Sequence, residues 1–254
     1  MIGAQGAALH GERAYSAPPV KKQVMKAAAK FREKALECNA VVYPNGVYPG
    51  DSDDKRAVQE AVYNLAKGAP RIGHAITLLG TEAETVVHLM RDKLNWPARR
   101  CWLVDWAKTP DNREQVLKAL MIARNMWPTA NVKKENILET LESVPTIGFA
   151  DLDFMGRMRP KDMQPAIQMC VDRLLVGGVL SVTWFRGRES QEEQRALRAR
   201  GFAATDLKEL RWAEVERMVQ GWAGECGITL ESVMSLEYQH KNSPMSVSVW
   251  RRTK

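Results

Sequence analysis

The segment LLVGGVLSVTW, residues 174–184, joins a glycine pair to a short apolar run. A helical pattern from about Pro160 to Leu174 precedes it, and glycine adopts without strain the positive φ that a passage from helix to strand favours. Gly177 and Gly178 therefore indicate a helix stop, and residues 179–185 are predicted to form a strand. A short apolar strand that follows a helix is typical of a parallel sheet buried on both faces.

The same alternation of strand and helix continues on both sides of this segment. Strand-like runs lie upstream at residues 72–80, 101–106 and 147–154, and residues 130–137 are predicted to be a short strand followed by a turn of helix. The longer helices are predicted at about 82–94, 112–126, 160–174 and 189–200. Right-handed crossovers would place such helices on both faces of one sheet.

The last part of the chain has a different pattern. After a helix predicted at 207–225, residues 228–239 and 245–252 alternate apolar and polar side chains around the turn HKNSP. This pattern is typical of an antiparallel hairpin. The sequence therefore predicts a doubly wound α/β fold, with a mostly parallel sheet and a C-terminal β-hairpin.

Five βα units followed by a hairpin resemble the class I (Rossmann-like) S-adenosylmethionine-dependent methyltransferase superfamily, and LLVGGVLSVTW is the best local match. The resemblance implies a seven-stranded sheet in a domain spanning residues 71–254. Residues 1–70 are predicted to be a basic helical N-terminal extension. It has an amphipathic helix at about 19–40 and a second helix at 54–67.

The resemblance implies a cofactor site beyond the carboxyl ends of the strands, where ligands of open α/β sheets bind. Asp105, after the second strand, is expected to accept both ribose hydroxyls, or else to be a solvated turn carboxylate or a helix cap. Asn136, after the third strand, occupies the place where the family often holds a residue beside the adenine. Asn also caps helices readily, and the apolar run ILETL follows it at once.

The segment ADLDFMG, residues 150–156, is similar to the acidic and aromatic motif at the end of the family's fourth strand. The resemblance assigns Asp151 to the cofactor side. It assigns Asp153 and Phe154 to a target base, through hydrogen bonding and stacking. Alternatively, Asp153 caps the following segment and Phe154 is a core residue.

The first loop departs from the family, whose members have several closely spaced glycines there. The loop here reads LLGTEAETV, with Gly80 alone before Thr81 and Glu82. One interpretation is a divergent methyltransferase in which these three residues bind S-adenosylmethionine. A second is a non-catalytic binding or scaffold protein with a degenerate pocket. A nicotinamide-dependent enzyme is a weaker third interpretation, because the GxGxxG fingerprint is missing.

The composition and motifs of the chain limit the classes of function and partner that it can have. The formal charge of +7 favours a polyanionic partner, and RNA or DNA is the leading expectation. Lys22 and Lys26 on the first helix, and Arg186 and Arg188 beyond the fifth strand, are the candidate phosphate contacts. The sequence has no metal-ligand spacing, GxSxG elbow or P-loop, and no apolar run of roughly 18 residues. The four separated cysteines and the absence of a signal pattern predict a cytoplasmic protein.

Overall fold

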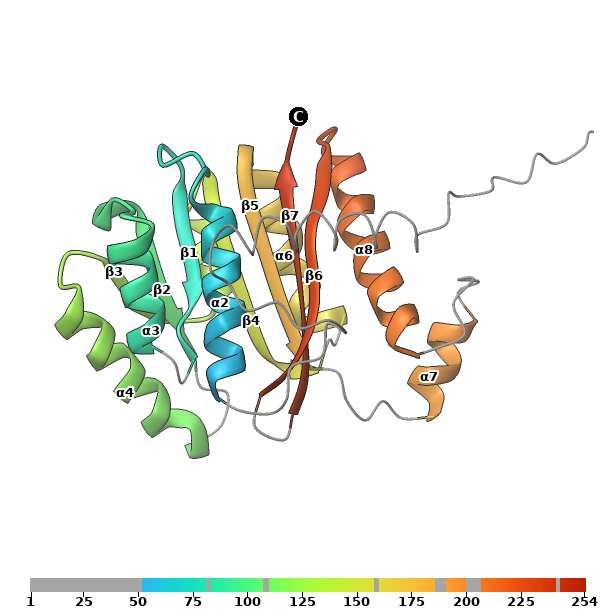
Figure 1. Ribbon diagram of the computed structural model, residues 1–254, viewed down its shortest axis with the longest axis horizontal. Coiled ribbons are helices and arrows are strands. Elements are labelled where there is room, and N and C mark those ends of the chain that lie inside the picture. The colour runs from blue at the N-terminus through green and yellow to red at the C-terminus, as the bar shows by residue number, and fades with distance from the viewer. Residues whose placement is uncertain are drawn as a thin grey trace, which may run out of the picture.

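The computed structural model of the chain describes residues 52–80, 83–106, 110–157, 160–185, 191–199, 207–240 and 243–254. These residues form a seven-stranded sheet with the order β3-β2-β1-β4-β5-β7-β6 (Figure 1). The strands are β1 (His74–Leu78), β2 (Cys101–Asp105), β3 (Asn131–Lys134), β4 (Ile147–Arg157), β5 (Leu174–Phe185), β6 (Leu230–His240) and β7 (Ser243–Arg252). Strands β1 to β5 pair in parallel, whereas β7 is antiparallel to both β5 and β6. The predicted fold class is therefore confirmed, including its C-terminal hairpin.

Helices cover both faces of the sheet (Figure 1). One buried cluster joins the sheet to α2 (Ser52–Ala66), α3 (Ala83–His88) and α4 (Pro110–Met126). A second buried cluster joins the opposite face of the sheet to α5 (Ile137–Glu142), α6 (Pro160–Arg173) and α8 (Leu207–Glu225). Helix α7 (Gln191–Arg198) packs against α8. None of the helices in the described ranges combines the length and the apolar character that a membrane span requires.

Helix α2 lies within the predicted N-terminal extension and packs directly on the sheet. Val58, Val62 and Ala66 recur at helical spacing and are buried. Tyr63 on the same face meets Phe149 of β4 edge to face, with ring centroids 5.2 Å apart. This packing fixes one helix of the extension over β4, β5 and β6. The helix predicted at 19–40 lies outside the described residues, and the domain boundary at residue 70 stays a prediction.

Two local features differ from the sequence predictions. The glycine pair does not stop α6, because that helix ends at Arg173 and β5 begins at Leu174. Gly177 has a φ of 81° inside β5, at the point where the pairing with β4 is irregular, so its positive φ accompanies that irregularity. The helix predicted at 82–94 is α3 followed by a π-helical turn, η2 (Leu89–Lys93).

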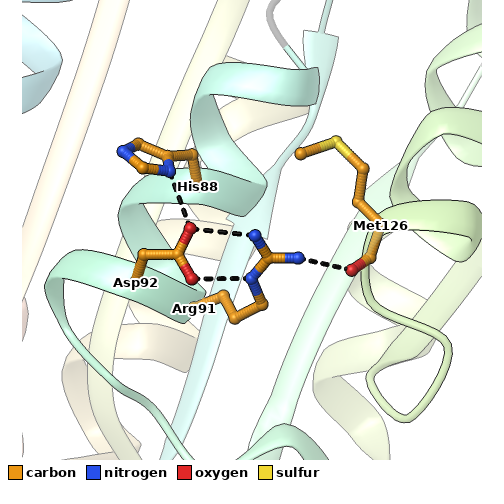
Figure 2. A network of polar contacts seen from close by, with 4 residues as sticks. All are labelled: His88, Arg91, Asp92 and Met126. Carbon is orange, nitrogen blue, oxygen red and sulfur yellow. Dashed lines mark hydrogen bonds and ion pairs between the residues drawn. The ribbon is translucent and has the colours of Figure 1, made fainter.

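A polar network joins η2 to the end of α4 (Figure 2). The carboxylate of Asp92 lies 2.7 Å from His88 Nδ1 and accepts hydrogen bonds from the Arg91 guanidinium. Arg91 Nη1 also donates to the carbonyl oxygen of Met126, at 2.6 Å. The hydrogen bonds from Arg91 favour the ionised carboxylate and lower the pKa of Asp92 to about 2. The network thus ties together two helices on the same face of the sheet.

Candidate functional site

The first two strands end side by side, and they bring Gly80 and Asp105 together. Gly80 follows β1 with a φ of 55°, and a Cβ built on it would meet no heavy atom of the described residues within 4 Å. Its backbone N–H donates to the carboxylate of Asp105, the last residue of β2. Trp106 donates its N–H to the same carboxylate, with a nitrogen-to-Oδ1 distance of 2.8 Å. The lone glycine of the loop therefore has open space beside it and an acidic neighbour.

The Asp105 carboxylate is half-buried at the carboxyl edge of the sheet. Burial raises its pKa, and the hydrogen bonds from Trp106 and Gly80 act in the opposite direction. A carboxylate has about four lone-pair sites, so two backbone donors do not exhaust it. Asp105 can therefore still accept hydrogen bonds from a ligand's hydroxyl groups.

Asn136 caps α5. Its Oδ1 accepts a hydrogen bond from the backbone N–H of Leu138, at 3.1 Å. Of the two roles predicted for Asn136 from the sequence, the structure therefore shows the helix cap. Because the oxygen is used by the helix, a role beside an adenine would fall to the side-chain Nδ2, and that role stays a prediction.

Asp153 of β4 forms a buried ion pair with Lys55 of α2. Lys55 Nζ lies 2.8 Å from Asp153 Oδ2, and the two side chains are 2% and 11% exposed. Burying either charge alone would be strongly unfavourable, so each requires the other. The pair places a cation from the N-terminal part of the chain at the acidic motif of the fourth strand.

Asp151, two residues earlier on β4, is also buried. Burial raises the pKa of its carboxyl group to about 7, and the nearby Asp153 carboxylate contributes to the rise. On β1, paired with β4 here, Thr77 lies opposite Asp151, and its Oγ1 is 3.4 Å from the hydroxyl of Tyr63. Burial likewise raises the pKa of Tyr63. Asp151 therefore changes its charge near neutral pH inside a polar pocket under α2.

A small cavity lies between α2 and the strands at this point. Its volume of about 10 Å³ matches one water-sized group. Two buried oxygens of its lining residues, Gln59 Oε1 and Asp153 Oδ1, accept no hydrogen bond from the part of the chain that the structure describes. The cavity is lined by Lys55, Val58, Gln59, Val62, Asp151, Asp153, Thr183 and Tyr238.

Phe154 lies on the other face of the sheet. Side chains alternate along a strand, and Phe154 packs against the cluster of α5, α6 and α8, whereas Asp153 lines the cavity under α2. The core alternative for Phe154 therefore has a structural basis, although its role toward a target base is untested. The structure does not bring Phe154 together with Asp153.

Several predicted site residues lie outside the described residues. Thr81 and Glu82 follow Gly80 in the first loop, Lys22 and Lys26 belong to the first predicted helix, and Arg186 and Arg188 follow β5. Their proposed contacts with cofactor and nucleic acid remain predictions.

Lys55 and Gln59, which line the cavity, were not predicted from the sequence. A signal was nevertheless present, because Lys55 and Gln59 precede Val62 and Ala66 at the spacing of one helix face. Polar residues on the apolar face of an amphipathic helix are candidates for burial with a partner. The partner of Lys55, Asp153, lies almost a hundred residues away in the chain, and local periodicity does not connect the two.

No protein-family model and no curated protein matches the sequence. Solved structures with a similar fold include the N-methyltransferase NodS from Bradyrhizobium japonicum, at 15% identity over 79% of this chain and 96% of that one, with a TM-score of 0.45. A putative rRNA methylase from Clostridium thermocellum is 10% identical over 76% and 93%, with a TM-score of 0.44. TrmN from Thermus thermophilus is 9% identical over 78% and 48%, with a TM-score of 0.46. These similarities concern the fold.

Proposed function

We propose that this chain, which has the class I methyltransferase fold, is an S-adenosylmethionine-dependent methyltransferase that acts on RNA or DNA. The observation that carries the proposal is that Gly80, with its positive φ, lies beside the Asp105 carboxylate at the carboxyl edge of the sheet. Such an edge is where ligands of open α/β sheets bind. In the proposal, the acceptor lies near the carboxyl end of β4, where Lys55 and Asp153 form their buried ion pair.

The described residues fit an adenosine-containing cofactor. The space beside Gly80 allows a ligand to approach the backbone, and the half-buried Asp105 retains lone pairs for ribose hydroxyls. In the proposal, Thr81 and Glu82 complete this side of the pocket, and Glu82 pairs with the cofactor's ammonium group. Asn136 contacts the adenine, and Asp151 closes the methionine side.

The cofactor would supply an activated methyl group on a sulfonium, so little acid-base chemistry is required of the protein. The chain's own contribution is alignment of the acceptor. Asp153 is held by Lys55 at the end of β4 and would orient the acceptor by hydrogen bonding. Phe154 would contribute to binding of the acceptor only from the opposite face of β4, where it packs against the cluster of α5, α6 and α8.

A nucleic-acid substrate is supported by the charge of the chain, +7. In the proposal, Arg186 and Arg188 hold phosphates next to the end of β5, and Lys22 and Lys26 extend this contact. Neutralised phosphates release counterions, so binding by these residues would weaken steeply with salt.

The first experiment is calorimetric titration of the full-length chain with S-adenosylmethionine and S-adenosylhomocysteine, with a nicotinamide dinucleotide as the control. Micromolar binding of the first two alone supports the proposal. Folded protein, free of copurified ligand, that binds none of the three contradicts it.

The second candidate is a non-catalytic binding or scaffold protein on the same fold. Two observations favour it: the first loop contains one glycine, and the Asn136 oxygen is already used in capping α5. A folded chain that binds RNA or DNA without binding S-adenosylmethionine would establish this candidate.

A further inference from the structure

The loops that lead into strands β1 to β4 lie at the amino edge of the sheet, which is uppermost in Figure 1 and opposite the candidate site. They are residues 67–73, 94–100, 127–130 and 143–146, and the second contains the short 3-10 turn η3 (Ala98–Arg100). We call them the amino-edge loops. They contain four cations, Lys67, Arg71, Arg99 and Arg100, and no Asp or Glu. They therefore supply a net charge of +4 toward the +7 of the whole chain.

The four cations are free to bind a partner. Each is exposed, and none forms an ion pair or a side-chain hydrogen bond with the part of the chain that the structure describes. Two aliphatic side chains on the same edge are also exposed, Ile72 at 73% and Val176 of β5 at 60%. The ammonium and guanidinium groups therefore keep all their N–H donors for a ligand.

Nearby carboxylates leave this positive charge in place. Asp92, which precedes the second loop, is already paired within the network of Figure 2. Glu142 and Asp172 lie at the ends of α5 and α6, which precede β4 and β5, and Glu231 of β6 lies opposite Arg251 of β7. All four cations of the loops, in contrast, precede β1 or β2. The positive charge is thus concentrated on one half of the amino edge, where it attracts anions.

The backbone of the first two loops is held in place. The Gly73 N–H donates to the carbonyl oxygen of Pro70, with a nitrogen-to-oxygen distance of 3.1 Å, and the Arg100 N–H donates to that of Pro97, at 2.8 Å. Each proline also restricts its own φ. Trp96 of the second loop is buried and packs against β4. Because the loops are already ordered, little conformational freedom is lost when a ligand binds them.

We propose that the first two amino-edge loops bind the phosphate backbone of a nucleic acid. Parallel pairing of β1 with β2 brings the two loops side by side, and three of the four cations are arginines. The planar guanidinium matches the geometry of a phosphate and can donate two parallel hydrogen bonds to it. An anionic membrane is a poorer match, because membrane-binding surfaces insert a broad apolar face, and this edge exposes only the small aliphatic pair Ile72 and Val176 within the described residues.

The inference goes beyond the proposed function, because these loops lie at the other end of the strands from Gly80 and Asp105. A strand rises about 3.3 Å per residue, so the five residues of β1 separate the two edges by roughly 15 Å or more. Phosphates bound at the amino edge therefore leave the proposed cofactor site open. The contact would anchor a nucleic acid in a methyltransferase and in a non-catalytic binding protein alike.

The salt dependence of binding tests the inference. Affinity of the full-length chain for a fluorescein-labelled DNA duplex of mixed sequence is measured by fluorescence anisotropy between about 50 and 200 mM salt. Each phosphate contact adds about 0.9 to the slope of log affinity against log salt concentration on duplex DNA. The double variant Arg99→Gln/Arg100→Gln should therefore lower this slope by about 1.8 and weaken binding severalfold. Adding Arg71→Gln should lower the slope further.

A matched control removes the same charge elsewhere. Arg113 and Lys118 are exposed on α4, so Arg113→Gln/Lys118→Gln changes the net charge equally and should leave the slope close to that of the wild type. The backbone bonds of η3 do not involve the arginine side chains, so both double variants should unfold at the temperature of the wild type in circular dichroism. Each should also bind S-adenosylmethionine as the wild type does in calorimetry.

Three results overturn the inference: folded wild-type protein that does not bind the duplex, an unchanged slope in Arg99→Gln/Arg100→Gln, and an equal decrease of the slope in both double variants. Sedimentation with vesicles of phosphatidylcholine and phosphatidylserine tests the membrane alternative. Vesicle binding that is lost in Arg99→Gln/Arg100→Gln, while its affinity for DNA is unchanged, also overturns the inference. Wild-type protein that binds DNA through these arginines but not S-adenosylmethionine contradicts only the proposed function.

Discussion

Lys55 of α2 and Asp153 of β4 form an ion pair of 2.8 Å in which the lysine side chain is only 2% exposed. The pair joins the N-terminal part of the chain to the fourth strand at the carboxyl edge of the sheet. Because α2 packs on β5 and β6 here, the small cavity beside the ion pair is lined by residues of both parts. A helix that the sequence assigns to an extension is thus part of the candidate site.

Lys55→Met should destabilise the protein more than an ordinary surface substitution. Removing the ammonium leaves the Asp153 carboxylate buried without its cation, and breaking a buried pair in this way costs about 3–5 kcal/mol. Urea unfolding monitored by circular dichroism measures the change in free energy. The double variant Lys55→Met/Asp153→Leu should recover most of the loss. A single variant as stable as the wild type would show that the pair contributes nothing to folding.

The order of elements along the chain could be predicted from local patterns. Short apolar runs between amphipathic helices predicted the five parallel strands, and residues 207–225 form the helix predicted there. Such features depend on neighbours in the sequence. The irregular pairing at Gly177 and the π-helical turn at Leu89–Lys93 depend on pairing and packing with distant elements, and no local periodicity specifies them.

The candidate site was predicted only in part, for the same reason. Asp105 and Asp153 were predicted because each lies at or near the carboxyl end of an apolar run, and strand ends of a parallel sheet meet at one edge. Their roles toward a ligand stay predictions. Lys55 and Gln59 come from a helix that crosses this edge, and the sequence alone does not say where α2 packs. The tertiary position of α2 makes two polar residues of an amphipathic helix part of the lining of the cavity.

Asp151 should make stability fall as pH rises through the acid range. Its pKa is about 7 in the folded protein and 3.8 in the unfolded chain, so between these values the folded state holds a proton that the unfolded state has lost. Stability therefore decreases by up to about 1.4 kcal/mol per pH unit and levels off above pH 7. The test compares urea unfolding of the wild type and Asp151→Asn from pH 4 to 8. Parallel curves for the two proteins would contradict the raised pKa.

Gly80→Ala should weaken cofactor binding beyond its effect on stability. A side chain at a φ of 55° introduces strain of about 1–2 kcal/mol, and the new methyl group projects into the space proposed for the cofactor. Gly227→Ala is the matched control, because Gly227 has a φ of 66° and equally open surroundings near β6. Both variants should lose similar stability in thermal unfolding. Only Gly80→Ala should lose affinity for S-adenosylmethionine in calorimetry, and equal affinities would remove Gly80 from the pocket.

Asn136 can be tested for two separate roles. Asn136→Asp keeps the oxygen that caps α5, and Asn136→Ala removes it, so the alanine variant should lose about 1 kcal/mol of stability relative to the aspartate variant. Both variants lack the Nδ2 donor. If Asn136 contacts the adenine, both should bind S-adenosylmethionine more weakly than the wild type. Undiminished affinity in the aspartate variant would leave capping as the role of this residue.

Asp105→Ala should weaken S-adenosylmethionine binding by about 1–3 kcal/mol, which is the usual effect of leaving buried hydroxyl groups without an acceptor. Asp105 also accepts N–H groups from Trp106 and Gly80, so part of any loss could reflect a rearranged loop. Asp105→Asn separates the two effects, because its amide oxygen can still accept from the backbone, whereas its charge is lost. The ribose assignment predicts that Asn binds the cofactor with intermediate affinity. Wild-type affinity in both variants, measured by calorimetry on folded protein, would leave Asp105 as a turn carboxylate.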